Sequence, residues 1–132
     1  MALDPKQHGV FSWNELMTDD LEGAKAFYGG LFGWTFSESP IKEGPMAGQK
    51  YVCGHVGEDM AAGLMGKPPG EGNMPSYWGA YVTVDSLEAS LEKVDALGGR
   101  TLLPPTEIPN AGRFAVIQDP QGAVLGIFQM SG

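Results

Sequence analysis

The sequence predicts an α+β fold: two tandem βαβββ modules whose curved mixed sheets surround a cleft. The first reason is an internal repeat, because a shift of 65 residues places residues 13–33 on 78–98 without a gap. The second reason is that the repeat returns near the end of each half, at a shift of 63 residues. The equivalent positions are Trp13 and Trp78, Thr18 and Thr83, Asp20 and Asp85, Ala24 and Ala89, Gly33 and Gly98, Tyr51 and Phe114, and Gly63 and Gly126.

The first module begins with a strand pattern over residues 9–18. Asp19 and Asp20 follow, and their carboxylates can cap a helix. Apolar residues at helical spacing then predict one hydrophobic helix face, and Gly33 suits the C-cap. This face consists of Leu21, Ala24, Phe27, Tyr28, Leu31 and Phe32. Short strand patterns over 34–37, 51–56 and 60–65 complete the module, with a Pro- and Gly-bearing loop at 40–48.

The second module repeats this order. Residues 77–84 form a strand pattern, and Asp85 to Glu88 resembles a capping box with Asp85 as the cap. Leu87, Leu91, Val94 and Leu97 give the helix stripe, which Gly98 and Gly99 end. Strand patterns follow at 101–103, 114–118 and 123–129, and residues 104–112 read as a Pro-bearing loop. A turn at 119–122 with Pro at its second position joins the last two strands.

Both modules fit in one domain of 132 residues, with module one at 9–66, a linker at 67–75 and module two at 76–130. A chain of this length can bury about two-thirds of its unfolded surface. Each module has one helix, which covers one face of its sheet and leaves the other uncovered. Two such faces can close around a cleft.

The composition excludes several classes of function. The chain has 8 basic and 16 acidic residues, a net charge of −8, which disfavours nucleic acid and anionic membranes as partners. No apolar run approaches the ~20 residues of a membrane span, and the first residues lack the apolar core of a signal peptide. Cys53 is the only cysteine, so no disulfide can form within the chain. We therefore expect a cytoplasmic protein.

Several motifs in this order resemble the vicinal oxygen chelate superfamily, which includes glyoxalase I, bleomycin-resistance proteins, extradiol dioxygenases and fosfomycin-resistance enzymes. The resemblance spans nearly the full chain and implies the fold rather than an activity. It also implies a homodimer, although one chain could form the cleft alone. The motifs are Asp20-x-x-x-Ala24-x-x-Phe27-Tyr28, Leu31 to Trp34, Val82-x-Val84-Asp85, Leu97-Gly98-Gly99 and Asp119-Pro120-x-Gly122.

In enzymes of this superfamily, the first and fourth strands of each module supply the metal ligands. The resemblance carries these positions to Asn14, Gly63, Gly79 and Gly126. Three glycines and one asparagine do not provide the three His, Glu or Asp ligands of a catalytic metal. We therefore predict no metal and no cofactor.

Other residues could still form a site. His8, His55, Cys53 and Glu15 are the remaining candidates for a metal, but regular alternation places Glu15 on the face opposite to Asn14. His55 is a weak candidate for a base, with the simpler interpretation that it is a strand histidine bonded to a neighbour. Cys53 is a candidate for a nucleophile beside it, with the simpler interpretation that it is a small core residue. Arg113 could meet an anion.

Aromatic residues on the strands and glycines at the ligand positions predict a roomy apolar cleft. The expected ligand-binding residues are Asn14, Tyr51, His55, Gly63, Gly79, Tyr81, Gly126 and Phe128. The equivalence of Trp13 and Trp78 predicts a shared structural role. We expect a metal-independent protein that binds a small apolar or aromatic molecule. The alternatives are an enzyme of the same superfamily, such as a lyase, isomerase, hydroxylase or dioxygenase, working through His55 or another metal site, and an interaction module with a vestigial cleft.

Overall fold

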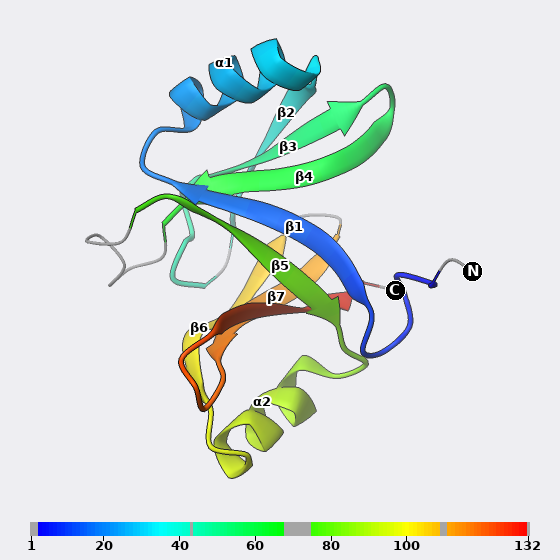
Figure 1. Ribbon diagram of the computed structural model, residues 1–132, viewed down its shortest axis with the longest axis vertical. Helices are drawn as coiled ribbons and strands as arrows, with labels where there is room; N and C mark the ends of the chain where they lie inside the picture. Colours follow the sequence, from blue (N-terminus) through cyan, green and yellow to red (C-terminus); the bar gives the residue numbers. More distant parts are fainter. Residues whose placement is uncertain (1–2, 43, 68–74, 109–110, 132) are drawn as a thin grey trace.

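The computed structural model describes residues 3–42, 44–67, 75–108 and 111–131. Within them lies one curled, mixed sheet of eight strands in the order β2-β3-β4-β1-β5-β8-β7-β6, with two helices (Figure 1). The fold is α+β, and each half of the chain has the order βαβββ. The elements are β1 Phe11–Thr18, α1 Leu21–Phe32, β2 Thr35–Pro40, β3 Lys50–Val56, β4 Asp59–Gly66, β5 Tyr77–Thr83, α2 Leu87–Ala96, β6 Arg100–Ile108, β7 Gly112–Gln118 and β8 Val124–Met130.

The two halves join edge to edge. Strand β1 runs parallel to β4 in the first half, and β5 runs parallel to β8 in the second. The first strands of the two halves, β1 and β5, then pair antiparallel at the centre of the sheet. Figure 1 shows α1 over β2, β3 and β4 at one end of the molecule and α2 beside β6 and β7 at the other. The sheet therefore has an outer face that carries the helices and a concave inner face.

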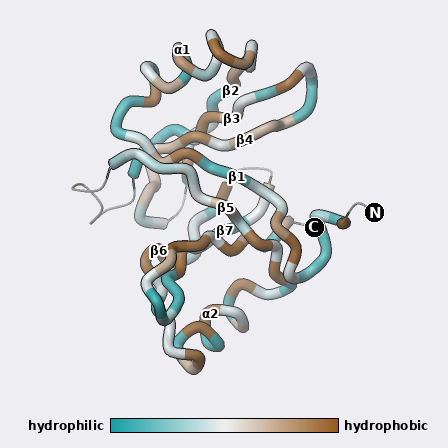
Figure 2. Tube along the Cα trace, viewed as in Figure 1, coloured by the Kyte–Doolittle hydropathy of each residue, from teal (hydrophilic) through white to brown (hydrophobic). Residues whose placement is uncertain are grey.

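Three hydrophobic clusters hold these layers together. Leu16, Val52 and Leu64 lie under α1, and Ala115 and Ile127 belong to the cluster at α2. The largest cluster fills the concave face. Its buried members are Met17, Ile41, Met46, Tyr51, Met65, Tyr81, Leu103, Ile108, Phe114, Val116 and Phe128. Figure 2 shows hydrophobic residues recurring along the strands and on both helices.

The ends of α1 agree with the sequence. The Asp20 carboxylate accepts a 2.9 Å hydrogen bond from the Gly23 amide, and Gly33 closes the helix in the left-handed conformation with φ 77°. The predicted apolar face is divided, however. Leu21, Ala24 and Tyr28 pack on the sheet, whereas Phe27, Leu31 and Phe32 are exposed.

The start of α2 differs from the prediction by one residue. Ser86, not Asp85, is the N-cap, and its hydroxyl accepts from the Ala89 amide at 3.2 Å. Glu88 is therefore not the third residue of a capping box. Its carboxylate instead pairs with Arg113. None of the described helices is long and apolar enough to cross a membrane.

Of the region predicted as a loop at 104–112, residues 104–108 are strand, and 109–110 lie outside the described residues. Strand β6 continues through Pro104 and Pro105 to Ile108, with register shifts between Thr101 and Leu103 and between Leu103 and Thr106. It is the last strand of the sheet, and Pro104 and Pro105 lie within the second register shift, where the ladder to β7 is interrupted; both settings tolerate a residue without an N–H.

Candidate functional site

A row of small and polar residues crosses the concave face. Directly paired residues on neighbouring strands point to the same side of a sheet. The pairing runs from Ser37 to Cys53, from Cys53 to Gly63, from Gly63 to Glu15 and from Glu15 to Gly79. Five strands thus bring a hydroxyl, a thiol, a carboxyl and two glycines into line. We call these five residues, Ser37, Cys53, Gly63, Glu15 and Gly79, the Glu15 row.

Glu15, and not Asn14, faces this interior. Glu15 is fully buried, whereas Asn14 is exposed on the outer face, so the expectation that Asn14 lines the cleft is wrong. The reason is a difference in connector length. Two residues separate β1 from α1, and three separate β5 from α2. A one-residue offset reverses every side chain of a strand.

The same offset separates the two repeated tryptophans. Trp13 lies on the inner face, where its indole Nε1 donates to the Tyr51 hydroxyl at 2.9 Å. Trp78 lies on the outer face, where its Nε1 donates to the Tyr28 hydroxyl of α1 at 3.0 Å. The predicted shared role is therefore wrong. When the first residue of α1 is aligned with the first residue of α2, the residue of β1 that corresponds to Gly79 is Trp13.

The Glu15 carboxyl has one strong partner. The Tyr81 hydroxyl donates to Oε1 at 2.6 Å, while Oε2 has no hydrogen-bond partner among the described residues. Burial raises the pKa of Glu15 to about 7, against the lowering effects of Tyr81 and, more weakly, Tyr51. No hydrogen bond of ordinary geometry joins Tyr51 to Oε2. This carboxyl can therefore gain or lose a proton near neutral pH.

Both inner tyrosines lie over glycines. A Cβ on Gly63 would overlap the Tyr51 hydroxyl, and a Cβ on Gly126 would overlap the Tyr81 ring. Burial and the Glu15 charge raise the pKa of each tyrosine, so both hydroxyls stay protonated. The absence of side chains at Gly63 and Gly126 is what allows these rings to reach the interior.

Most of the predicted binding residues meet here. Tyr51, Tyr81 and Phe128 belong to the inner cluster. Gly63 and Gly126 lie beneath the tyrosines. Gly79 is paired with Glu15. Glu15 and Trp13, neither of which was in the predicted set, join this group through hydrogen bonds with Tyr81 and Tyr51. A charged residue in the middle of a strand of apolar neighbours was the available signal for Glu15.

His55 lies on the same face, nearer the edge of the sheet. Its Nε2 is 2.8 Å from the Ser37 hydroxyl, which agrees with the simpler interpretation of a histidine bonded to a neighbour. Cys53 is half-buried, and burial together with the Glu15 charge raises its thiol pKa, which disfavours a nucleophile. His8 is distant from this set in the fold: its Nδ1 accepts from the Asp85 amide at 3.0 Å.

No three His, Cys, Asp or Glu side chains gather as metal ligands in the part of the chain that the structure describes. Among the four inner positions that correspond to the superfamily's ligands, Trp13, Gly63, Gly79 and Gly126, none offers a metal-binding side chain. Glu15 is two residues beyond Trp13 and offers a single carboxyl.

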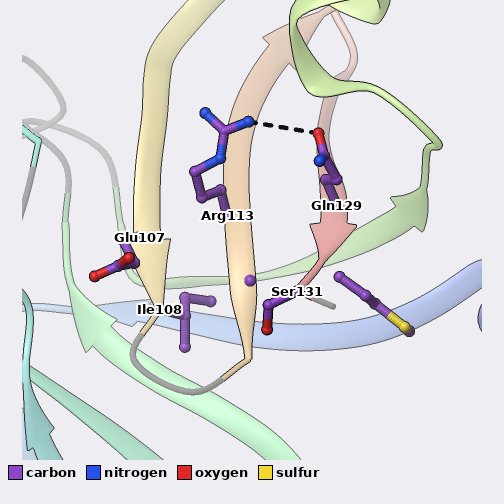
Figure 3. A pocket seen from close by; sticks show the side chains of 7 residues that line it. Glu107, Ile108, Arg113, Gln129 and Ser131 are labelled. Atoms are coloured by element: carbon purple, nitrogen blue, oxygen red, sulfur yellow. Dashed lines mark hydrogen bonds between the residues drawn. The ribbon is translucent and has the colours of Figure 1, made fainter.

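Two hollows lie at the far end of the second half. One of about 450 Å³ is lined by Glu107, Ile108, Gly112, Arg113, Gln129, Met130 and Ser131 (Figure 3). The other, of about 470 Å³, lies near Lys6 and Thr83. Arg113 makes bonds of 2.7 and 3.0 Å with Glu88, so its charge is already balanced. Neither hollow includes Ser37, Cys53, Gly63, Glu15 or Gly79.

Comparison with known proteins agrees with this fold. The profile of the Glyoxalase/Bleomycin resistance protein/Dioxygenase superfamily matches residues 10–127. The chain belongs to this superfamily.

The chain is similar to CFP32 of Mycobacterium tuberculosis, named as a candidate glyoxylase, which is 37% identical over 93% of the chain and 46% of the relative. The anthracycline biosynthesis protein DnrV of Streptomyces peucetius is 30% identical over 92% of the chain and 47% of the relative. The chain thus spans about half the length of the curated relatives it matches.

Solved structures of the glyoxalase fold include two epimerases. Methylmalonyl-CoA epimerase of Mycobacterium tuberculosis superimposes with a TM-score of 0.62 at 14% identity, covering 94% of this chain and 91% of the other. Methylmalonyl-CoA epimerase of Streptomyces coelicolor, in an E43Q form with 2-nitronate-propionyl-CoA, superimposes with a TM-score of 0.66 at 12% sequence identity. The match covers 96% of this chain and 100% of the other. At these identities the likeness shows the fold alone.

Proposed function

We propose that this chain binds a small apolar or aromatic molecule on its concave face, between the two modules, without a metal ion. The observation that carries this proposal is the Glu15 row. A buried carboxyl and two tyrosines surround glycine positions in an otherwise apolar interior, which is the usual composition of a small-molecule site. The relative named for anthracycline biosynthesis supports an organic molecule as the ligand class.

The available donors support binding without a metal. The inner positions that would correspond to the superfamily's ligands are three glycines and a tryptophan. Tyr51 and Tyr81 also occupy the space above Gly63 and Gly126 where ligating side chains would stand. A divalent ion held by the Glu15 carboxyl alone would lack the further ligands that such an ion requires.

A variant pair at Gly79 tests the location. A Cβ at Gly79 would meet nothing closer than 3.9 Å, so Gly79→Ala keeps the interior and Gly79→Phe fills it. We expect a panel of small aromatic molecules to raise the Tm of the wild type and of Gly79→Ala but not of Gly79→Phe, with the same result in a chelator. Equal Tm shifts in all three proteins would exclude the concave face, and loss of the shifts in chelator would exclude metal independence.

Proton transfer by Glu15 is the second candidate function. A general base works best when its pKa lies near the working pH, and the pKa of Glu15 is about 7. The structural neighbours named as epimerases give a first substrate to try. Exchange of the methylmalonyl-CoA α-proton in D2O, followed by NMR, should then require Glu15 and survive His55→Ala. Exchange that survives Glu15→Gln and fails in His55→Ala would assign the base to His55 instead.

A further inference from the structure

We propose that the ligand of the concave face carries a protonated amine, which binds Glu15 Oε2 while the apolar body lies over Gly79 between Tyr77 and Tyr81. This inference rests on the proposed binding function and adds the charge and the position of the ligand. It follows from three features of the same site: a glycine with room for a methyl group, a buried carboxyl with one oxygen that lacks a hydrogen bond within the described chain, and flanking aromatic rings.

The least covered of the three inner glycines is Gly79. It is paired directly with Glu15, and Tyr77 and Tyr81 are the next residues on the same face of β5. Gly63, on the other side of Glu15, is covered by Tyr51 and Trp13. A Cβ at Gly79, in contrast, would find its nearest neighbours at 3.9 Å, the Glu15 carbonyl oxygen and the Tyr77 ring. The half-exposed Tyr77 ring is therefore the group that a ligand over Gly79 would displace.

The carboxyl selects a donor. Glu15 Oε1 accepts from Tyr81, and Oε2 is buried with no hydrogen-bond partner among the described residues. The other buried polar residues that the structure describes are Thr18, Thr83 and Thr106, and the buried side chain of Lys67 is paired with Asp19. No positively charged group of the described residues acts on the Glu15 carboxyl. A buried carboxylate without a counter-charge is costly, and a bound cation would offset that cost.

The surroundings favour a cation over a neutral donor. Tyrosine faces attract an ammonium group through the negative charge of the ring face, and carboxylates together with aromatic rings are a common way to bind organic cations. The ionisable groups that face Glu15 are Tyr51 and Cys53 on β3 and Tyr81 and Tyr77 on β5, none of which carries a positive charge. The net charge of −8 also attracts cations from solution.

Three probes of one shape test this inference: phenethylamine, 2-phenylethanol and 3-phenylpropionate. Calorimetry at pH 8 should give a Kd for the amine about tenfold below that of the alcohol, as expected for one hydrogen bond to a charged group, and no binding of the acid. At pH 5.5, where Glu15 is protonated, the preference for the amine should disappear. The Trp13 indole N–H signal should shift on binding of the amine, since Trp13 adjoins the site.

Two variants complete the experiment. Glu15→Gln should lose the preference for the amine, whereas Glu92→Gln, an exposed change of equal charge on α2, should keep it. If the alcohol binds the wild type as tightly as the amine, the inference fails while the proposed binding function stands. If neither of these two probes binds, both fail. An equal loss in Glu15→Gln and Glu92→Gln would show that surface charge, not Glu15, selects the amine.

Discussion

The Tyr81 hydroxyl donates a 2.6 Å hydrogen bond to Glu15 Oε1 across the β1–β5 junction, the only strand pair that joins the two modules in the described sheet. This bond places the ionisable carboxyl of one half in contact with the aromatic interior of the other. The Tyr81 ring also packs edge-on against Phe114, with centroids 5.5 Å apart. Protonation of Glu15 is therefore coupled to packing between the modules.

Stability should depend on the proton at Glu15. The folded pKa of about 7 lies above the ordinary value of 4.5, so the folded state holds this proton more tightly than the unfolded chain. The associated stability is complete below pH 4.5 and is lost as the pH rises through 7. Between pH 4.5 and pH 7 we expect the free energy of unfolding of the wild type to fall by about 3 kcal/mol more than that of Glu15→Gln. Urea denaturation at pH 4.5, 6 and 8 measures this; parallel pH profiles for the two proteins would contradict it.

Removal of the Tyr81 hydroxyl should destabilise the fold. Tyr81→Phe leaves Glu15 Oε1 without its donor, which costs about 1–3 kcal/mol for a buried group. It should also raise the pKa of Glu15 further, because the Tyr81 bond lowers it. Tyr28→Phe is the matched control, since its hydroxyl only accepts from Trp78 near the surface. Equal losses of unfolding free energy in the two variants would show that the Glu15 bond has no special weight.

The three inner glycines should respond differently to alanine. The new methyl group overlaps Tyr51 in Gly63→Ala and Tyr81 in Gly126→Ala, and such overpacking typically costs about 1–3 kcal/mol. Gly79→Ala meets ordinary contacts only and should be neutral or slightly stabilising. Chemical denaturation of the three variants gives the order. Gly79→Ala as the least stable of the three would contradict the expectation that Gly79 has room for a methyl group.

The repeat in the sequence was sufficient to predict the two βαβββ modules, because caps, stripes and turns recur at nearly constant spacing. It was not sufficient to predict which side chains face inward. Val84 to Ser86 is one residue longer than Asp19 to Asp20, and the extra residue is absorbed in a connector without a hydrophobic pattern. Successive side chains of a strand point to opposite faces of the sheet. Because of this single extra residue, Glu15 and not Asn14 points to the interior. The strand through Pro104 and Pro105 was missed for another reason: proline argues against a strand unless the strand is known to lie at an edge.

The exposed face of α1 should mediate self-association. Phe27, Leu31 and Phe32 are 61%, 59% and 59% exposed, although the helix already packs on the sheet through its opposite side. We propose a second copy of this chain as the occupant, because the relatives are about twice as long and so have room for a second such unit. Sedimentation velocity should show a dimer for the wild type and for Leu97→Lys, an exposed apolar control near the end of α2, and a monomer for Phe27→Glu/Leu31→Lys. A wild type that stays monomeric at high concentration would refute this role, as would a double variant that still dimerises.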